Sequence, residues 1–142
     1  FDVSDVSNPK ELHKIVIGDR GTQSTALDDH KAFLFDKKKN LLVLPILLAE
    51  IKGEKTGDNQ YGDYTFEGAY VYNLDIKNGF KLKGKVNHHG DLDIFKKSGY
   101  YIIRDTFIKR SLYIGDILYT FSDSVLQLNK LSDLSVIKRI IF

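Results

Sequence analysis

The sequence predicts an all-β fold, and three observations carry this prediction. Short runs of alternating apolar and polar residues recur along the 142 residues, no long segment has helical periodicity, and tight-turn residues separate the runs. The composition is that of a folded domain, because 42% of the residues are hydrophobic and 28% are charged. A chain of this length accommodates one ordinary domain.

Several segments have the alternation and composition expected of strands. Pro45 lies inside one of them and predicts an edge position or a bulge there, because proline cannot donate to a strand ladder. Gly, Asn and Asp between the segments supply the positive φ angles that tight hairpins need. The expected strands are residues 32–36, 41–48, 68–75, 80–86, 100–104, 111–115, 117–123, 125–130 and 136–142.

Two sets of segments repeat along the chain. Segments 1–18, 71–88 and 126–142 each consist of an alternating strand, a turn containing Asp or Asn, and a second strand with basic residues on one face. Segments 31–46 and 110–123 also align, and each precedes a member of the first set. The order is therefore a half unit followed by two units of four antiparallel strands.

Units of four antiparallel strands that stack on one another are the blades of a β-propeller. We therefore expect a partial β-propeller of about two and a half blades in one domain, residues 1–142, with a half blade at 1–18 and blades at 30–88 and 100–142. A closed ring needs at least about four blades, so we expect a fragment of a larger propeller. The missing blades or other copies of the chain would complete it. An antiparallel sandwich or open meander is the alternative.

Several stretches together resemble a known family. They are FDVSDVSNPKEL with its continuation IGDRGTQS, DHKAFLFDKKKNLLVLPI, the FEGAYVYNLD block, and RSLYIGD with the LYT and SDS that follow it. In order and combination they resemble an archaeal and bacterial family of secreted proteins that carry a C-terminal β-propeller domain distantly related to WD40 repeats. The resemblance covers nearly the whole chain. It implies a propeller fold, a location outside the cell or at its surface, and no established catalytic activity.

Charge and composition exclude several classes of site. The net charge is +2, and the one dense basic run, Lys37 to Lys39, lies in a predicted hairpin turn where solvated lysines are common. A nucleic-acid interface would gather basic residues on one face with aromatic side chains between them, so no nucleic-acid partner is expected. The absence of cysteine excludes disulfides and thiolate metal ligands. No apolar run approaches the ~18 residues of a membrane span.

Histidine and aspartate residues cluster on two predicted connections between blades. The motif LDDH ends at His30, and the motif NHHGDLD contains His88, His89 and Asp91. Both motifs connect the last strand of one blade to the first strand of the next, so we expect them at one rim of the central channel. Imidazole suits zinc and carboxylate suits calcium. The interpretations left open are a turn held by an Asp–His pair, a zinc or calcium site formed by these four residues, and catalysis.

A long polar connection, residues 50–66, contains two tyrosines. Tyr61 and Tyr64 stand beside Asp, Asn and Gln residues, and a connection of this length is usually functional or mobile. A tyrosine ring supplies contact area with a polar tip, so both tyrosines are candidates for contacting a protein or carbohydrate ligand. The alternative is that Tyr64 begins a strand and packs inside the blade.

No motif identifies a catalytic residue, because a GxSxG elbow, a complete phosphate loop and a distinct carboxylate pair are all absent from the sequence. The leading hypothesis is a non-enzymatic binding or scaffolding module at the cell surface that acts through loops at one propeller face. The alternative is a metal-assisted hydrolase or lyase with a His/Asp site at the channel mouth. A purely structural propeller, the third possibility, predicts no deep polar pocket.

Overall fold

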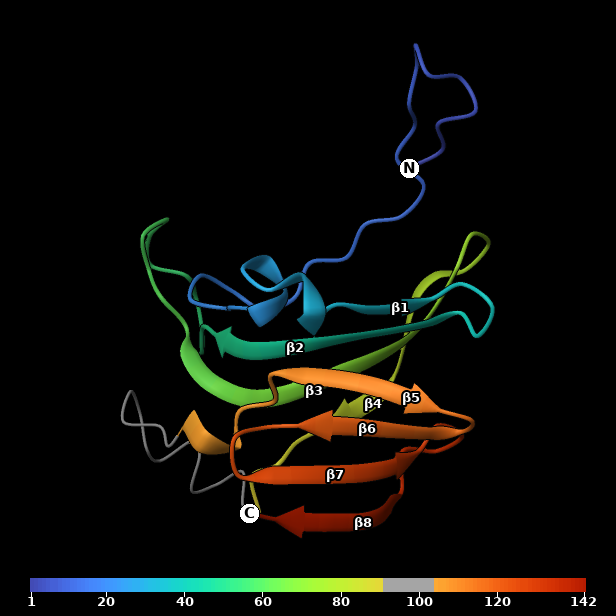
Figure 1. The fold of residues 1–142 in the computed structure, drawn as a ribbon. Coiled ribbons are helices and arrows are strands. Elements are labelled where there is room, and N and C mark those ends of the chain that lie inside the picture. Colours follow the sequence, from blue (N-terminus) through green and yellow to red (C-terminus); the bar gives the residue numbers. More distant parts are fainter. Residues whose placement is uncertain (91–103) are drawn as a thin grey trace.

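The computed structural model describes residues 1–90 and 104–142, which form two four-stranded antiparallel sheets and three short 3₁₀ helices (Figure 1). The first sheet, blade 1, contains β1 (Leu34–Asp36), β2 (Leu41–Glu50), β3 (Asp63–Asp75) and β4 (Gly79–Val86). The second sheet, blade 2, contains β5 (Arg110–Ile114), β6 (Ile117–Phe121), β7 (Val125–Lys130) and β8 (Val136–Ile141). The helices are η1 (Thr25–Leu27), η2 (His30–Ala32) and η3 (Arg104–Thr106).

This architecture confirms the predicted all-β fold of four-stranded antiparallel blades. Each strand pairs with its neighbour in the chain, so both sheets have the simple order expected of a blade. β3 begins at Asp63 rather than at residue 68, which shortens the expected loop. The strand expected at 100–104 falls outside the described residues except for Arg104, which begins η3. None of the helices in the described ranges has the length and apolar character needed to cross a bilayer.

Residues 1–18 carry no strand, although the sequence predicted a half blade there. The segment contains one isolated bridge, between Asp2 and Lys10, and is exposed through Val16. A two-stranded hairpin is marginally stable on its own, which accounts for the absence of a longer ladder. The described residues therefore form two blades rather than two and a half.

Both faces of blade 1 are covered. The face toward blade 2 carries a cluster shared by both blades: Leu41, Val43, Ala69, Val71, Val86, Ile108, Leu118 and Leu131. The opposite face carries the aromatic-rich cluster Leu42, Ile46, Leu48, Phe66, Tyr70 and Tyr72. Strand alternation explains this division, because the register pairs Val43 with Val71 on one face and Leu42 with Tyr72 on the other.

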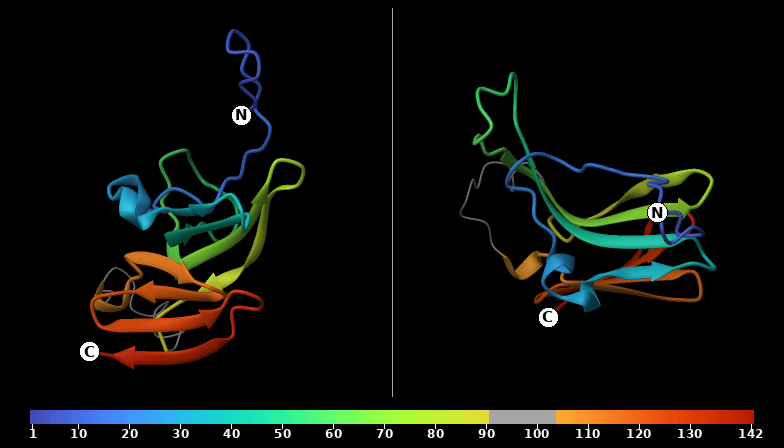
Figure 2. Two further views of the ribbon diagram at one scale, coloured as in Figure 1. Left: turned by 45° about the vertical axis from the view of Figure 1, so that its right-hand side comes forward. Right: turned by 90° about the horizontal axis from the view of Figure 1, so that it is seen from above.

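The N-terminal segment covers part of the second face. Ile17 packs against the aromatic-rich cluster, and His13 Nε2 lies 2.7 Å from the carbonyl oxygen of Ile76. Figure 2 shows this segment on the side of blade 1 away from blade 2. The segment therefore contributes packing to blade 1 without adding a strand to it.

Blade 2 has one covered face. Its buried side chains, Leu118, Thr120, Val125, Gln127 and Asn129, lie on the face toward blade 1. The other face exposes Leu112 and Ile114 at 40% and 64%. Every residue of the outer strand β8 is exposed.

Pro45 occupies an edge-like position inside β2. The ladder between β1 and β2 covers only residues 41–43, so no strand lies beside Pro45 on that side. The Pro45 carbonyl instead accepts a hydrogen bond of 2.7 Å from Ser24 Oγ. The bulge of this strand pair lies further on, between Leu48 and Ala49, so the edge alternative describes Pro45 correctly.

Candidate functional site

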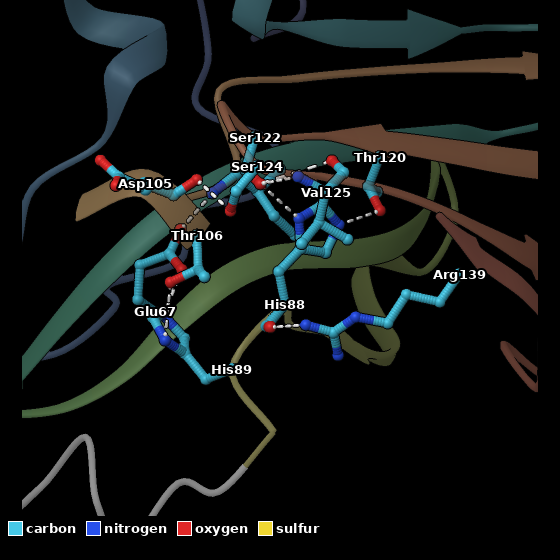
Figure 3. Close-up of polar contacts among 11 residues, drawn as sticks. Glu67, His88, His89, Asp105, Thr106, Thr120, Ser122, Ser124, Val125 and Arg139 are labelled. Carbon is cyan, nitrogen blue, oxygen red and sulfur yellow. Dashed lines mark hydrogen bonds and ion pairs between the residues drawn. The ribbon is translucent and has the colours of Figure 1, made fainter. Parts of the chain in front are cut away.

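A polar cluster lies between the two blades where β4 ends (Figure 3). β4 ends at Val86, which pairs with Ala69 of β3. Gly68 permits this approach, because a Cβ at that position would clash with the Val86 carbonyl oxygen. The chain then places His88 and His89 beside residues of blade 2. We call this polar group the junction cluster; its members are Glu67, His88, His89, Thr106, Thr120, Ser122 and Arg139.

His88 joins blade 1 to blade 2 through both ring nitrogens. Nδ1 lies 3.0 Å from Ser122 Oγ, and Nε2 lies 2.8 Å from Thr120 Oγ1. The carbonyl oxygen of His88 accepts a hydrogen bond from the guanidinium of Arg139 on β8. The side chain is fully buried, and this burial, with the nearby charges of Arg139 and His89, lowers the pKa of His88 to about 4. A neutral ring donates from one nitrogen and accepts at the other, so His88 is a bridge between the blades.

Glu67 is a buried carboxylate in the middle of β3, only 2% exposed. Its Oε1 accepts a 2.7 Å hydrogen bond from the backbone amide of Ile108, and its Oε2 lies 2.8 Å from His89 Nε2. His89 Nδ1 lies 3.0 Å from Thr106 Oγ1. Burial raises the pKa of Glu67, while the hydrogen bonds from His89 and Ile108 oppose the rise. Both oxygens thus have the partners that a buried carboxylate needs.

Glu67 was not among the site residues predicted from the sequence. The residue shares its strand face with Ala69 and Val71, so alternation alone predicts an apolar side chain there. The available signal was a single acidic residue on the inward side of the run FEGAYVY. The partners of His88, which are Thr120, Ser122 and Arg139, were missed for a similar reason, since they become relevant only when the two blades pack.

The structure brings together only some of the predicted metal ligands. His88 and His89 belong to the junction cluster, His30 lies exposed in η2, and Asp91 lies outside the described residues. Within residues 1–90 and 104–142, no group of three or more His, Cys, Asp or Glu side chains is arranged to hold a metal ion. The four-residue zinc or calcium site stays a prediction.

The LDDH motif contains a turn contact and a contact with blade 2. Asp29 Oδ1 accepts a 2.9 Å hydrogen bond from the Lys31 amide, and Oδ2 lies 3.2 Å from Nη2 of Arg110 on β5. The Lys31 amide contributes most to holding the pKa of Asp29 below its ordinary value, and the Arg110 charge adds to it. Asp29 therefore holds the turn that begins η2, and the pairing of an aspartate with His30 stays a prediction.

A cavity of about 330 Å³ opens beside the junction cluster. Its lining comes from the segment before β1, from β2, from Glu67, and from η3 and the segment that follows it. Four of its polar side chains make no hydrogen bond or ion pair within the described part of the chain: Gln23, Thr25, Asp28 and Arg104. Pro45 and Phe107 contribute apolar surface. Convergent polar groups on a largely apolar wall are typical of a ligand pocket.

The two predicted ligand-binding tyrosines lie in different environments. Tyr61 is 60% exposed, and the Arg20 guanidinium carbon lies 4.5 Å from its ring centroid. Arg20 Nη1 also donates a 2.6 Å hydrogen bond to Asn59 Oδ1, which ties the loop to the segment before β1. Tyr64 lies inside β3, half-buried and paired with Ala49, as the alternative interpretation expected. The loop therefore presents Tyr61 to solvent.

Comparison with known proteins identifies one family. A family model described as a beta propeller domain matches residues 1–134. No curated protein and no solved structure matches the chain.

Proposed function

Since the chain belongs to the β-propeller domain family, we propose that it is a non-enzymatic binding or scaffolding module that contacts its partner through loops at one end of the blades. The observation that carries this proposal is the cavity of about 330 Å³ beside the junction cluster. Segments preceding both blades supply its polar side chains, so a ligand there would contact both repeats. Loops positioned by a rigid sheet commonly carry binding groups.

The proposed partner is a carbohydrate or a protein outside the cell or at its surface. Amide, hydroxyl, carboxylate and guanidinium groups beside an apolar wall can hydrogen-bond a polar ligand and pack against its apolar part. The partner class is supported by these lining groups and by exposed Tyr61. The location is supported by the motif resemblance to secreted proteins.

A glycan microarray and a panel of cell-surface protein extracts, each probed with the purified chain, would test this proposal. The affinity for any ligand found would then be measured by calorimetry for Arg104→Ala and Gln23→Ala, with Lys14→Ala as a control outside the cavity. We expect each cavity variant to weaken binding by about tenfold, equivalent to about 1.4 kcal/mol. Absence of any ligand, or ligands whose affinity is unaffected by both cavity variants, would contradict the proposal.

A further inference from the structure

A second cavity lies at the other end of the junction between the blades. It has a volume of about 450 Å³ and adjoins the turns that follow β1, β5 and β7, on the right of Figure 1, whereas η3 lies on the left. Its charged lining residues are Lys39, Lys83, Lys130 and Asp116, and its apolar lining residues are Leu41 and Leu131. Three ammonium groups and one carboxylate leave an excess of positive charge around the cavity.

Lys83 reaches this cavity from a bulge in β4. The register pairs Gly84 with Val71 and Leu82 with the next residue of β3, so Lys83 has no cross-strand partner. A bulge redirects the side chain of its extra residue. This part of β4 also lies against blade 2, because a Cβ on Gly84 would be 2.7 Å from Leu134 Cδ1. The bulge therefore adds a lysine from blade 1 to a cavity shared with blade 2.

Lys39 is positioned by residues of blade 2. Its Nζ lies 3.0 Å from Asp116 Oδ1 and 5.3 Å from the ring centroid of Tyr113. Its backbone amide donates a 2.9 Å hydrogen bond to Asp36 Oδ1, which fixes the turn. Lys39 is exposed in the hairpin turn, as expected for the run 37–39, and it also contacts blade 2.

The other two lysines have no ion pair within the part of the chain that the structure describes. Lys83 is exposed on β4, and Lys130 is exposed at the end of β7. The Lys130 charge adds to the lowering of the Asp133 pKa, which is caused mainly by a hydrogen bond from Ser135. Two ammonium groups of this cavity are therefore available for an anion.

We propose that this cavity binds a phosphate or sulfate group, either free or carried by a larger molecule. Ammonium groups act as compact point charges toward phosphate, and here they come from three separate strands or turns of both blades. The contact with the Tyr113 ring already restricts Lys39, so less side-chain entropy is lost when an anion binds. Ser132 adds a hydroxyl donor to the lining. This site is separate from the cavity of the proposed function and does not depend on it.

Amide chemical shifts of the ¹⁵N-labelled chain, followed during titration with sodium phosphate at constant ionic strength, would test the proposal. Saturable shifts are expected at amides lining the cavity, around Lys39, Gly84 and Leu131. The double variant Lys83→Gln/Lys130→Gln should weaken affinity by about tenfold or more, because it removes two of the three charges. The control Lys14→Gln/Lys77→Gln removes two exposed charges outside the cavity and should leave affinity unchanged.

Asp116→Asn provides a second variant with the opposite expected effect. Asp116 supplies the one carboxylate among the described lining residues, so its removal should tighten phosphate binding by about threefold or more. The side chain is 91% exposed, so folding should be unaffected. Titration with glycerol 1-phosphate distinguishes a free ion from a phosphate group carried by a larger molecule. Tighter binding than that of inorganic phosphate indicates a group carried by an organic molecule, and equal binding indicates a free ion. Lack of saturable shifts, or equal weakening in both double variants, would overturn the proposal.

Discussion

Blade 1 and blade 2 have the same strand order and the same antiparallel pairing, but they differ in what covers them. The third strand of blade 1 is buried from Phe66 to Tyr72, between blade 2 on one side and the N-terminal segment on the other. No residue of β8 in blade 2 is buried. Both blades nevertheless show strand alternation in their sequences.

This difference shows that an alternating sequence specifies a strand with two distinct faces. The elements that pack against the sheet then determine which of its faces are buried. Leu112 and Ile114 are as apolar as the core residues of blade 1, yet they lie on an open face. Contiguous exposed apolar surface commonly marks an interaction site. Completion of this face by further blades or another copy of the chain stays a prediction.

The largest expected effect comes from truncating one leucine on each face of blade 2. Leu118 is fully buried in the core shared by both blades, so Leu118→Ala should lower the free energy of unfolding by about 3 kcal/mol. Leu112 is 40% exposed on the open face, so Leu112→Ala should cost less than about 1 kcal/mol. Urea denaturation of both variants measures the difference. Equal losses would show that the open face is covered in solution.

Loss of the buried carboxylate should be the next largest effect. Glu67→Ala leaves the Ile108 amide and His89 Nε2 without their shared acceptor, which should destabilise the chain by about 2 kcal/mol. The cavity beside Glu67 admits water, which limits the loss. Glu54→Ala, an exposed loop substitution, is the control for urea denaturation. A loss no greater than that of the control would mean that the junction does not depend on this carboxylate.

Low pH should lower the free energy of unfolding, because protonation of His88 disrupts the contact between the blades. Its pKa is about 4 in the folded chain, below the ordinary value of 6.5, so the unfolded chain binds the proton more readily between these values. The stability supplied by neutral His88 is therefore present above pH 6.5 and lost as the pH falls toward 4, and the loss reaches about 2 kcal/mol at pH 5. The raised pKa of Glu67 acts in the opposite direction. The difference between wild type and His88→Gln isolates the histidine contribution.

That difference is measured by urea denaturation at a series of pH values. His30→Gln, an exposed substitution in η2, should keep the wild-type pH dependence. A pH profile of His88→Gln that parallels the wild type would refute the assignment to His88.

The smallest effect is expected at the contact between the exposed edge strand and blade 1. Arg139→Met removes the hydrogen bond to the His88 carbonyl and should cost about 1 kcal/mol. The same change removes a positive charge that lowers the His88 pKa, so the folded-state pKa of His88 should rise toward 6.5 and the acid-sensitive range should narrow from its lower end. Lys138→Met, on the opposite face of β8, should change neither the free energy of unfolding nor its dependence on pH.

Local signals in the sequence predicted the strands, because alternation and turn residues are properties of adjacent positions. Eight expected strands and their antiparallel order agree with the structure. Residues 1–18 form only an isolated bridge in this structure, because a strand pattern also needs a sheet to pair with. Contacts between blades have no local signature, which is why Glu67 and the partners of His88 were missed. Tyr64 was partly anticipated, through the alternative that it starts a strand.

The outer strand of each blade carries one bulged residue, Lys83 in β4 and Ile137 in β8, and neither has a partner across its ladder. A position without a cross-strand partner can change its chemistry while the hydrogen-bonded frame of the repeat is retained. Each blade therefore has a position whose side chain can vary while the strand ladder is kept, and in blade 1 that position, Lys83, lies at the cavity shared by the two blades.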